Sequence, residues 1–167
     1  MIFLIVKIIG CILIVSSSFL IGYSKSKKLY LRRDFLKSFV VFLNSLSTNI
    51  RYDSADIFTT VSMSARNNDL IYISKLENNK PFDKQWQEKI SSLPNTLALN
   101  KSDKELLSEF GNELGKTDID GQLKHIEFYK NLFDNQLLAA EEDIISKSKL
   151  YKTIGLFAGI STALMII

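Results

Sequence analysis

Few side chains in this sequence have the types and spacing that acid–base, nucleophilic or metal chemistry requires. The single histidine, His125, and the single cysteine, Cys11, lie far apart in the chain, so no cluster has the spacing of a zinc site. No Asp or Glu stands beside a base or nucleophile that would mark it as catalytic. The sequence therefore predicts no catalytic residue, no metal ligand and no cofactor, and His125 is interpreted as a histidine that packs or faces solvent.

Two short motifs resemble functional ones. Gly115-Lys116-Thr117 matches the end of a phosphate-binding loop, but it lacks the upstream strand and the first glycine of that loop, so we interpret it as a helix corner. Ile8-Ile9-Gly10-Cys11 is similar to a lipoprotein cleavage box. The apolar run continues beyond Cys11, whereas a signal peptide ends its apolar run at the cut, so we do not expect lipidation.

The chain begins and ends with an apolar segment. Ile2 to Tyr23 carries one charge, Lys7, and as a helix it would span roughly 33 Å, which matches the hydrocarbon core of a bilayer. Thr153 to Ile167 would reach about 22 Å, so it must borrow the residues before it while Lys152 reaches back to the interface. The alternative, a helix that dips in from one face, leaves the terminal carboxylate in hydrocarbon. We predict transmembrane helices over residues 1–23 and 153–167.

Basic residues give the orientation of these two spans. Lys and Arg near the ends of a span mark its cytosolic side, and here they flank only the inner ends: Lys25, Lys27, Lys28, Arg32, Arg33, Lys147, Lys149 and Lys152. We therefore expect a cell-membrane protein whose domain of residues 24–152 is cytosolic, with both termini outside. The net charge of +3 suits a lipid bilayer with anionic headgroups, and no basic stripe with interleaved aromatics predicts nucleic-acid binding.

The predicted domain is all-α, a compact bundle of about six helices between the two transmembrane helices. Apolar residues recur at helical spacing, first at Leu31, Phe35, Phe39, Leu43, Leu46 and Ile50, in a helix that continues the first span. Asp53-Ser54-Ala55-Asp56 predicts the start of a second helix, residues 70–76 a short third one, and Pro81 the first turn of a fourth that carries Phe82, Trp86 and Ile90. Ser102 and Glu105 match a capping box that opens a fifth helix, with Gly115 at its end.

The sixth helix is expected to run from Asp118 to the C-terminus without a break. Its core face is predicted at Ile119, Leu123, Ile126, Tyr129, Phe133, Leu137, Ala140 and Ile144, and a second buried ridge at Phe128, Leu132 and Leu138. Glu141, Glu142 and Asp143 form an acidic run that is either a solvated face or a docking patch for a partner. Gly155 and Gly159 have the spacing that lets helices approach closely in lipid, so they could contact the first span or another subunit.

Several of these residues resemble a known family. The segments that carry the resemblance are Asn49-Ile50-Arg51-Tyr52, Phe110-Gly111-x-x-Leu114-Gly115-x-x-Asp118, Gln122-x-Lys124-His125-Ile126 and Lys149-Leu150-Tyr151-Lys152-x-x-Gly155-x-x-Ala158-Gly159. They are similar to stage III sporulation protein AB of endospore-forming bacteria, which has the same order of span, helical domain and span. At Gly111, Leu114, Gly115 and Asp118 a structural role in the corner is sufficient, since Asp118 fits a helix N-cap.

The resemblance implies a helical domain similar to that of the F-type platform proteins of type II secretion systems. It implies a role in the channel complex between mother cell and forespore, in the mother-cell membrane around the forespore. The implied partners are a secretion-type ATPase and other membrane subunits of that complex. Platform proteins commonly have two such domains and three spans, so a rotating platform would require this chain to form a homo-oligomer.

Two other functions compete with a non-enzymatic platform. A membrane-bound hydrolase would need an interior polar pocket, and the sequence gives no support for an active site. A two-span membrane sensor whose stem helices relay a signal would need folded matter outside the cell, and almost none is predicted at either end. A scaffold of another complex is a further alternative.

Overall fold

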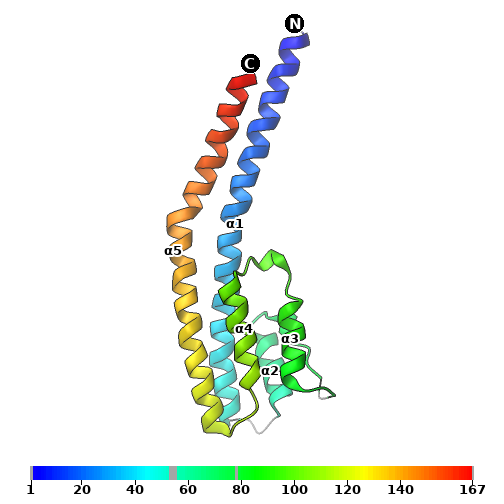
Figure 1. The fold of residues 1–167 in the computed structure, drawn as a ribbon, viewed down its shortest axis with the longest axis vertical. Coiled ribbons are helices and arrows are strands. Elements are labelled where there is room, and N and C mark those ends of the chain that lie inside the picture. Colours follow the sequence, from blue (N-terminus) through cyan, green and yellow to red (C-terminus); the bar gives the residue numbers. More distant parts are fainter. Residues whose placement is uncertain (1, 53–55, 78, 167) are drawn as a thin grey trace. The chain divides into compact units, whose positions relative to one another are not determined.

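Two long helices dominate the fold, and three shorter ones lie between them in the chain. The computed structural model describes every residue except 1, 53–55, 78 and 167, and the described residues form α-helices and short 3-10 helices (η) but no strand. The elements are α1 Ile2–Tyr52, α2 Ile57–Asn67, η1 Ile71–Ile73, α3 Phe82–Ser91, η2 Asn95–Leu97, α4 Lys101–Glu113 and α5 Ile119–Ile166 (Figure 1). The all-α prediction is confirmed.

The chain divides into two compact units that share α1 and α5. Residues up to 31 and from 140 onward form one unit, called the helix pair below, and residues 32–139 form the other, called the bundle. The predicted boundaries near residues 24 and 152 refer to a membrane, and they stay a prediction.

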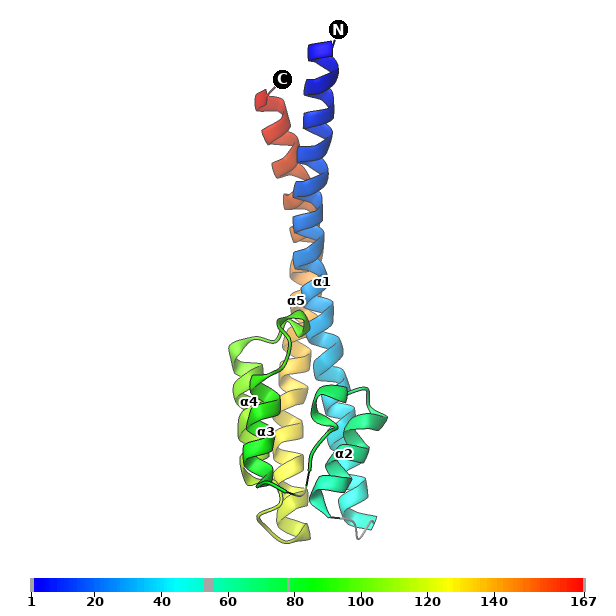
Figure 2. The same ribbon diagram turned by 90° about the vertical axis from the view of Figure 1, so that its right-hand side faces the viewer.

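Aromatic side chains fill the core of the bundle. The rings of Phe39 on α1 and Phe133 on α5 lie 4.5 Å apart, and Phe110 of α4 meets Phe39 edge to face at 5.8 Å. Trp86 of α3 is fully buried against Phe110, and its indole N–H donates a hydrogen bond to the Leu107 carbonyl at 2.6 Å. Such a bond removes the cost of burying an indole, so the ring can pack between α3 and α4, which lie side by side (Figures 1 and 2).

The helix pair consists of two antiparallel helices with their termini at the same end (Figures 1 and 2). Many of its large apolar side chains are exposed, with exposed fractions of 65% for Leu13, 62% for Leu20, 61% for Phe157 and 70% for Leu164. Within the described residues, α1 from Lys7 onward is the one helix whose length and composition would let it cross a membrane. Apolar surface of this extent is typical of a membrane or partner contact.

Two predictions about local structure are wrong. The third helix, expected over residues 70–76, is only the 3-10 turn η1. The capping box that opens α4 is formed by Asn100 and Asp103 instead of Ser102 and Glu105. Both pairs have the required spacing, but the observed one places the Asp103 carboxylate inside the bundle, where it meets Arg32. The predicted start of the second helix is confirmed at Asp56, the N-cap of α2, and residues 53–55 of that signal lie outside the described residues.

The second ridge predicted on the sixth helix is not buried either. Phe128 and Leu138 are 59% and 58% exposed, and Leu132 is half-buried, whereas Ile126, Phe133 and Ala140 of the main face are buried. Helical periodicity shows which apolar residues share a side of α5, but it does not show how far the neighbouring helices reach around it.

Candidate functional site

The two helices of the helix pair come into backbone contact at glycines. A Cβ atom at Gly155 would lie 2.8 Å from the Ser18 carbonyl oxygen and 3.0 Å from the Gly22 Cα, and a Cβ at Gly159 would lie 2.9 Å from the Val15 Cα. The Ser18 hydroxyl donates a hydrogen bond to the Gly155 carbonyl oxygen at 2.7 Å. The structure thus places Gly155 and Gly159 against α1 of the same chain. Such close backbone contact requires small residues on both helices.

Two residues on the α1 side of this contact, Gly22 and Ser26, were missed by the sequence interpretation. Gly22 and Ser26 are both buried against α5, and with Ser18 they repeat every four residues. The Ser26 and Ser148 hydroxyls form a hydrogen bond of 2.8 Å, and the Tyr30 hydroxyl lies 3.3 Å from Ser148. The spacing of small residues in Ser18-x-x-x-Gly22-x-x-x-Ser26 is the signal that could have revealed this face.

The acidic run lies on the α5 part of the helix pair. Glu141 and Glu142 are exposed, while Asp143 is half-buried and forms an i,i+4 ion pair with Lys147 at 2.5 Å. Glu141 and Glu142 are therefore the two members of the run that present charge to solvent.

The corner between α4 and α5 is held by four residues with structural roles. A Cβ at Gly111 would overlap the Trp86 ring, and Leu114 is 2% exposed. Gly115 has a φ of +84°, a backbone conformation that favours glycine, and its N–H donates to the Gln122 side chain at 2.9 Å. The Asp118 carboxylate accepts the Gly121 N–H at 2.9 Å, which is the contact of a helix N-cap at the start of α5.

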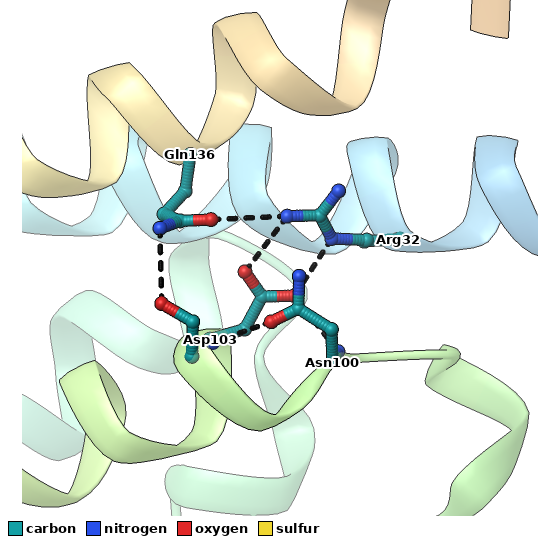
Figure 3. Close-up of polar contacts among 5 residues, drawn as sticks. Arg32, Asn100, Asp103 and Gln136 are labelled. Carbon is teal, nitrogen blue, oxygen red and sulfur yellow. Dashed lines mark hydrogen bonds and ion pairs between the residues drawn. The ribbon is translucent and has the colours of Figure 1, made fainter. Parts of the chain in front are cut away.

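A buried ion pair in the bundle was not predicted. Arg32 was counted among the basic residues that flank the first predicted span, but it is only 7% exposed. Figure 3 shows its guanidinium reaching from α1 to the Asp103 carboxylate on α4, with distances of 2.7 Å from Nε to Oδ2 and 3.0 Å from Nη2 to Oδ1. Nη2 also donates to Gln136 Oε1 on α5 at 3.0 Å (Figure 3). The Gln136 amide in turn donates to the Ser102 hydroxyl at 3.1 Å. This network ties three helices together by charge-assisted hydrogen bonds.

His125 also has a partner inside the bundle. Its Nε2 lies 2.8 Å from the Phe110 carbonyl oxygen, and its ring stacks on Phe110 with centroids 5.5 Å apart. The neighbouring Tyr129 has a pKa above its usual value because burial disfavours the phenolate and because Glu109 and Glu113 repel it. Among the described residues no three His, Cys, Asp or Glu side chains come together as a metal site would require.

A surface pocket of about 520 Å³ lies between α2, the start of α3 and the corner before α5. Its polar lining comes from Asn79, Lys80, Asp83 and Lys116, and its apolar lining includes Phe58 and Phe82. Lys80 lies 4.0 Å from Glu88, and Lys116 lies 3.4 Å from Glu113. This lining does not bring a nucleophile together with a base, as a nucleophilic active site would require.

Comparisons with known proteins agree with the resemblance noted in the sequence. The family described as stage III sporulation protein AB matches residues 7–167. Stage III sporulation protein AB of Bacillus subtilis (strain 168) is 25% identical over 168 residues, which cover 96% of this chain and 98% of that protein. No solved structure matches the chain. The match extends from the first apolar segment through the bundle to the C-terminus, and the chain belongs to the stage III sporulation protein AB family.

Proposed function

We propose that this protein is a non-enzymatic membrane platform or scaffold subunit of the sporulation channel complex between mother cell and forespore. In this proposal it couples that complex to a cytosolic secretion-type ATPase. The observation that carries the proposal is that one chain contains two compact units: a helix pair with exposed apolar side chains and a separately packed helical bundle. Membership of a sporulation family supports the cellular process.

The proposed topology is two-pass, with the bundle in the cytosol and both termini outside. In support, Ile154, Leu156, Phe157, Ile160, Leu164 and Met165 of α5 are all exposed, at fractions between 38% and 89%. The small residues that face α1 would be shielded from lipid by it, as expected for paired transmembrane helices. By resemblance, the membrane is that of the mother cell around the forespore.

The topology can be tested with single cysteines and a membrane-impermeant maleimide. Cys11→Ser removes the only native thiol, and a cysteine is then placed either in a short C-terminal tag or at Lys75, an exposed residue of the bundle. The protein is expressed in non-sporulating cells, where it inserts into the cell membrane that faces the medium. We expect the tag to react in these intact cells and Lys75→Cys to react only after the cells are opened. Labelling of both positions in intact cells would contradict the topology.

The proposed partner surface is the exposed part of the acidic run, Glu141 and Glu142. The test is coexpression of the tagged full chain with the ATPase and other membrane subunits of the complex, followed by capture from solubilised membranes. We expect the ATPase to be retained by the wild type and lost with Glu141→Lys/Glu142→Lys. The matched control is Glu109→Lys/Glu127→Lys, which makes the same charge change at two other exposed glutamates.

The outcomes separate the two parts of the proposal. Failure of the wild type to retain the ATPase, alone and with the other subunits, would reject the coupling role. Equal retention by all three chains would reject only the acidic run as the contact.

A further inference from the structure

Six lysines surround the helix pair where its apolar part ends. They are called the lysine collar, and they are Lys25, Lys27 and Lys28 of α1 with Lys147, Lys149 and Lys152 of α5. Five of the six are exposed, and Lys152 is half-buried.

Contacts between the two helices show that the lysines lie at one level of the pair. Gly22 packs against Tyr151 and Gly155, Ser26 bonds to Ser148, and the Lys152 ammonium lies over the Tyr23 ring at 5.8 Å from its centroid. Residues 22–28 of α1 therefore run beside residues 147–153 of α5. At 1.5 Å per residue, all six lysines fall within about 9 Å along the axis.

The collar has almost no negative charge of its own to balance it. Residues 1–33 and 144–167 contain no Asp or Glu. The nearest carboxylates in the sequence are Asp34, which pairs with Arg33 at 2.7 Å, and Asp143, which pairs with Lys147. In the described part of the chain, Lys25, Lys27, Lys28 and Lys149 make no ion pair with a carboxylate.

The surroundings of the collar identify the kind of anion that would balance it. Leu20 and Ile21 on α1 and Ile154 on α5 expose apolar side chains directly beside it, and Tyr23 and Tyr30 are exposed at its level. Exposed tyrosines next to an apolar surface are typical of the level of lipid headgroups. A soluble acidic protein could neutralise the lysines, but it would leave the adjacent apolar surface uncovered.

We propose that the lysine collar binds the phosphate headgroups of anionic phospholipids, so that this protein gathers anionic lipid around its helix pair. The inference rests on the two-pass topology proposed above. Both helices contribute to the collar, and Lys152 is held across the pair by Tyr23, so a headgroup can contact lysines of α1 and α5 at once. The attraction is electrostatic and is weakened by salt.

The experiment measures lipid selectivity around the full-length chain. The protein is reconstituted into phosphatidylcholine vesicles that contain spin-labelled phosphatidylglycerol or spin-labelled phosphatidylcholine, and the motionally restricted fraction of each is compared. We expect a several-fold preference for phosphatidylglycerol that falls with added salt. Lys25→Gln/Lys27→Gln/Lys28→Gln and Lys149→Gln/Lys152→Gln should each lower the preference, and the combined variant should abolish it.

The matched control is Lys75→Gln/Lys84→Gln/Lys124→Gln, which removes three exposed lysines of the bundle and should leave the preference unchanged. The proposal is overturned if the wild type shows no preference, if the combined variant keeps it, or if the control loses it equally. Flotation of each chain with the vesicles is measured in parallel. A chain that fails to float contradicts the transmembrane topology, whereas a chain that floats without lipid preference contradicts the collar alone.

Discussion

The guanidinium of Arg32 and the carboxylate of Asp103 form a two-point ion pair sealed inside the bundle, with both side chains at most 9% exposed. Removing one partner of such a pair leaves the other charged group buried without compensation, which costs about 3–5 kcal/mol. We expect Asp103→Asn to lower the free energy of unfolding of the bundle by this amount. Urea unfolding of the full chain in detergent, followed by the fluorescence of the single tryptophan, Trp86, measures it.

Glu105→Gln is the control for this change. Glu105 pairs with Lys101 at 3.5 Å, but both side chains are exposed, so the expected loss is below about 1 kcal/mol. Equal losses in the two variants would show that the buried pair contributes no more than a surface pair.

Gly155→Leu should separate the two helices of the pair, because the new side chain would meet backbone atoms of α1 at Ser18 and Gly22. Ser26→Cys/Ser148→Cys, in a Cys11→Ser background, reports the separation, since the native hydroxyls lie 2.8 Å apart. We expect efficient disulfide formation in membranes and a strong reduction with Gly155→Leu. Gly10→Leu has no atom within 4 Å of its Cβ and should leave the yield unchanged. An unchanged yield with Gly155→Leu would contradict the contact.

Gly111→Ala should disturb the core of the bundle. Its Cβ would overlap the Trp86 ring, which is fully buried, and overpacking of this kind typically costs about 1–3 kcal/mol. A red shift of Trp86 emission and a lower urea midpoint are the expected signs. Glu109→Ala, an exposed position of the same helix, should stay within about 0.5 kcal/mol of the wild type. The same small effect at Gly111 would mean that the ring can move aside.

Tyr129 should make the stability of the bundle depend on pH in alkaline solution. Burial and repulsion by Glu109 and Glu113 raise the pKa of its phenol, so the folded chain holds that proton more tightly than the unfolded chain. The stabilisation is therefore complete below a pH of about 10 and is lost as the pH rises through the raised pKa. Tyr129→Phe should lose less stability than the wild type over that range in urea unfolding. The same change at the exposed Tyr72 is the control, and identical curves for all three chains would reject this role.

The sequence predicted the long helices and most of the core because their signals are local. Phe39, Phe133 and Trp86 lie on apolar faces with helical spacing, and all three are buried. The corner before α5 was predictable for the same reason, since a glycine and an N-cap residue mark it. The burial and the partners of residues that pair across different helices could not be predicted from such local signals.

Arg32 and Asp103 illustrate why. In the sequence, Arg32 is one of several basic residues after an apolar segment, and nothing distinguishes it from Arg33. Asp103 fits one of two overlapping capping boxes. The ion pair forms only because α1, α4 and α5 pack together in the bundle. This packing brings Arg32 and Asp103 into contact although they are 71 positions apart in the sequence.

The contact between Ser18 and Gly155 has a consequence for how the protein is made. The two residues are separated by 137 positions. At about 5–20 residues per second, a ribosome needs on the order of 10 s to travel between them. In a chain inserted during synthesis, the face of α1 that contains Ser18 and Gly22 would lie in the bilayer for that time without α5 against it. If the proposed two-pass topology holds, another helix with small residues could occupy the face during this interval, before α5 is made.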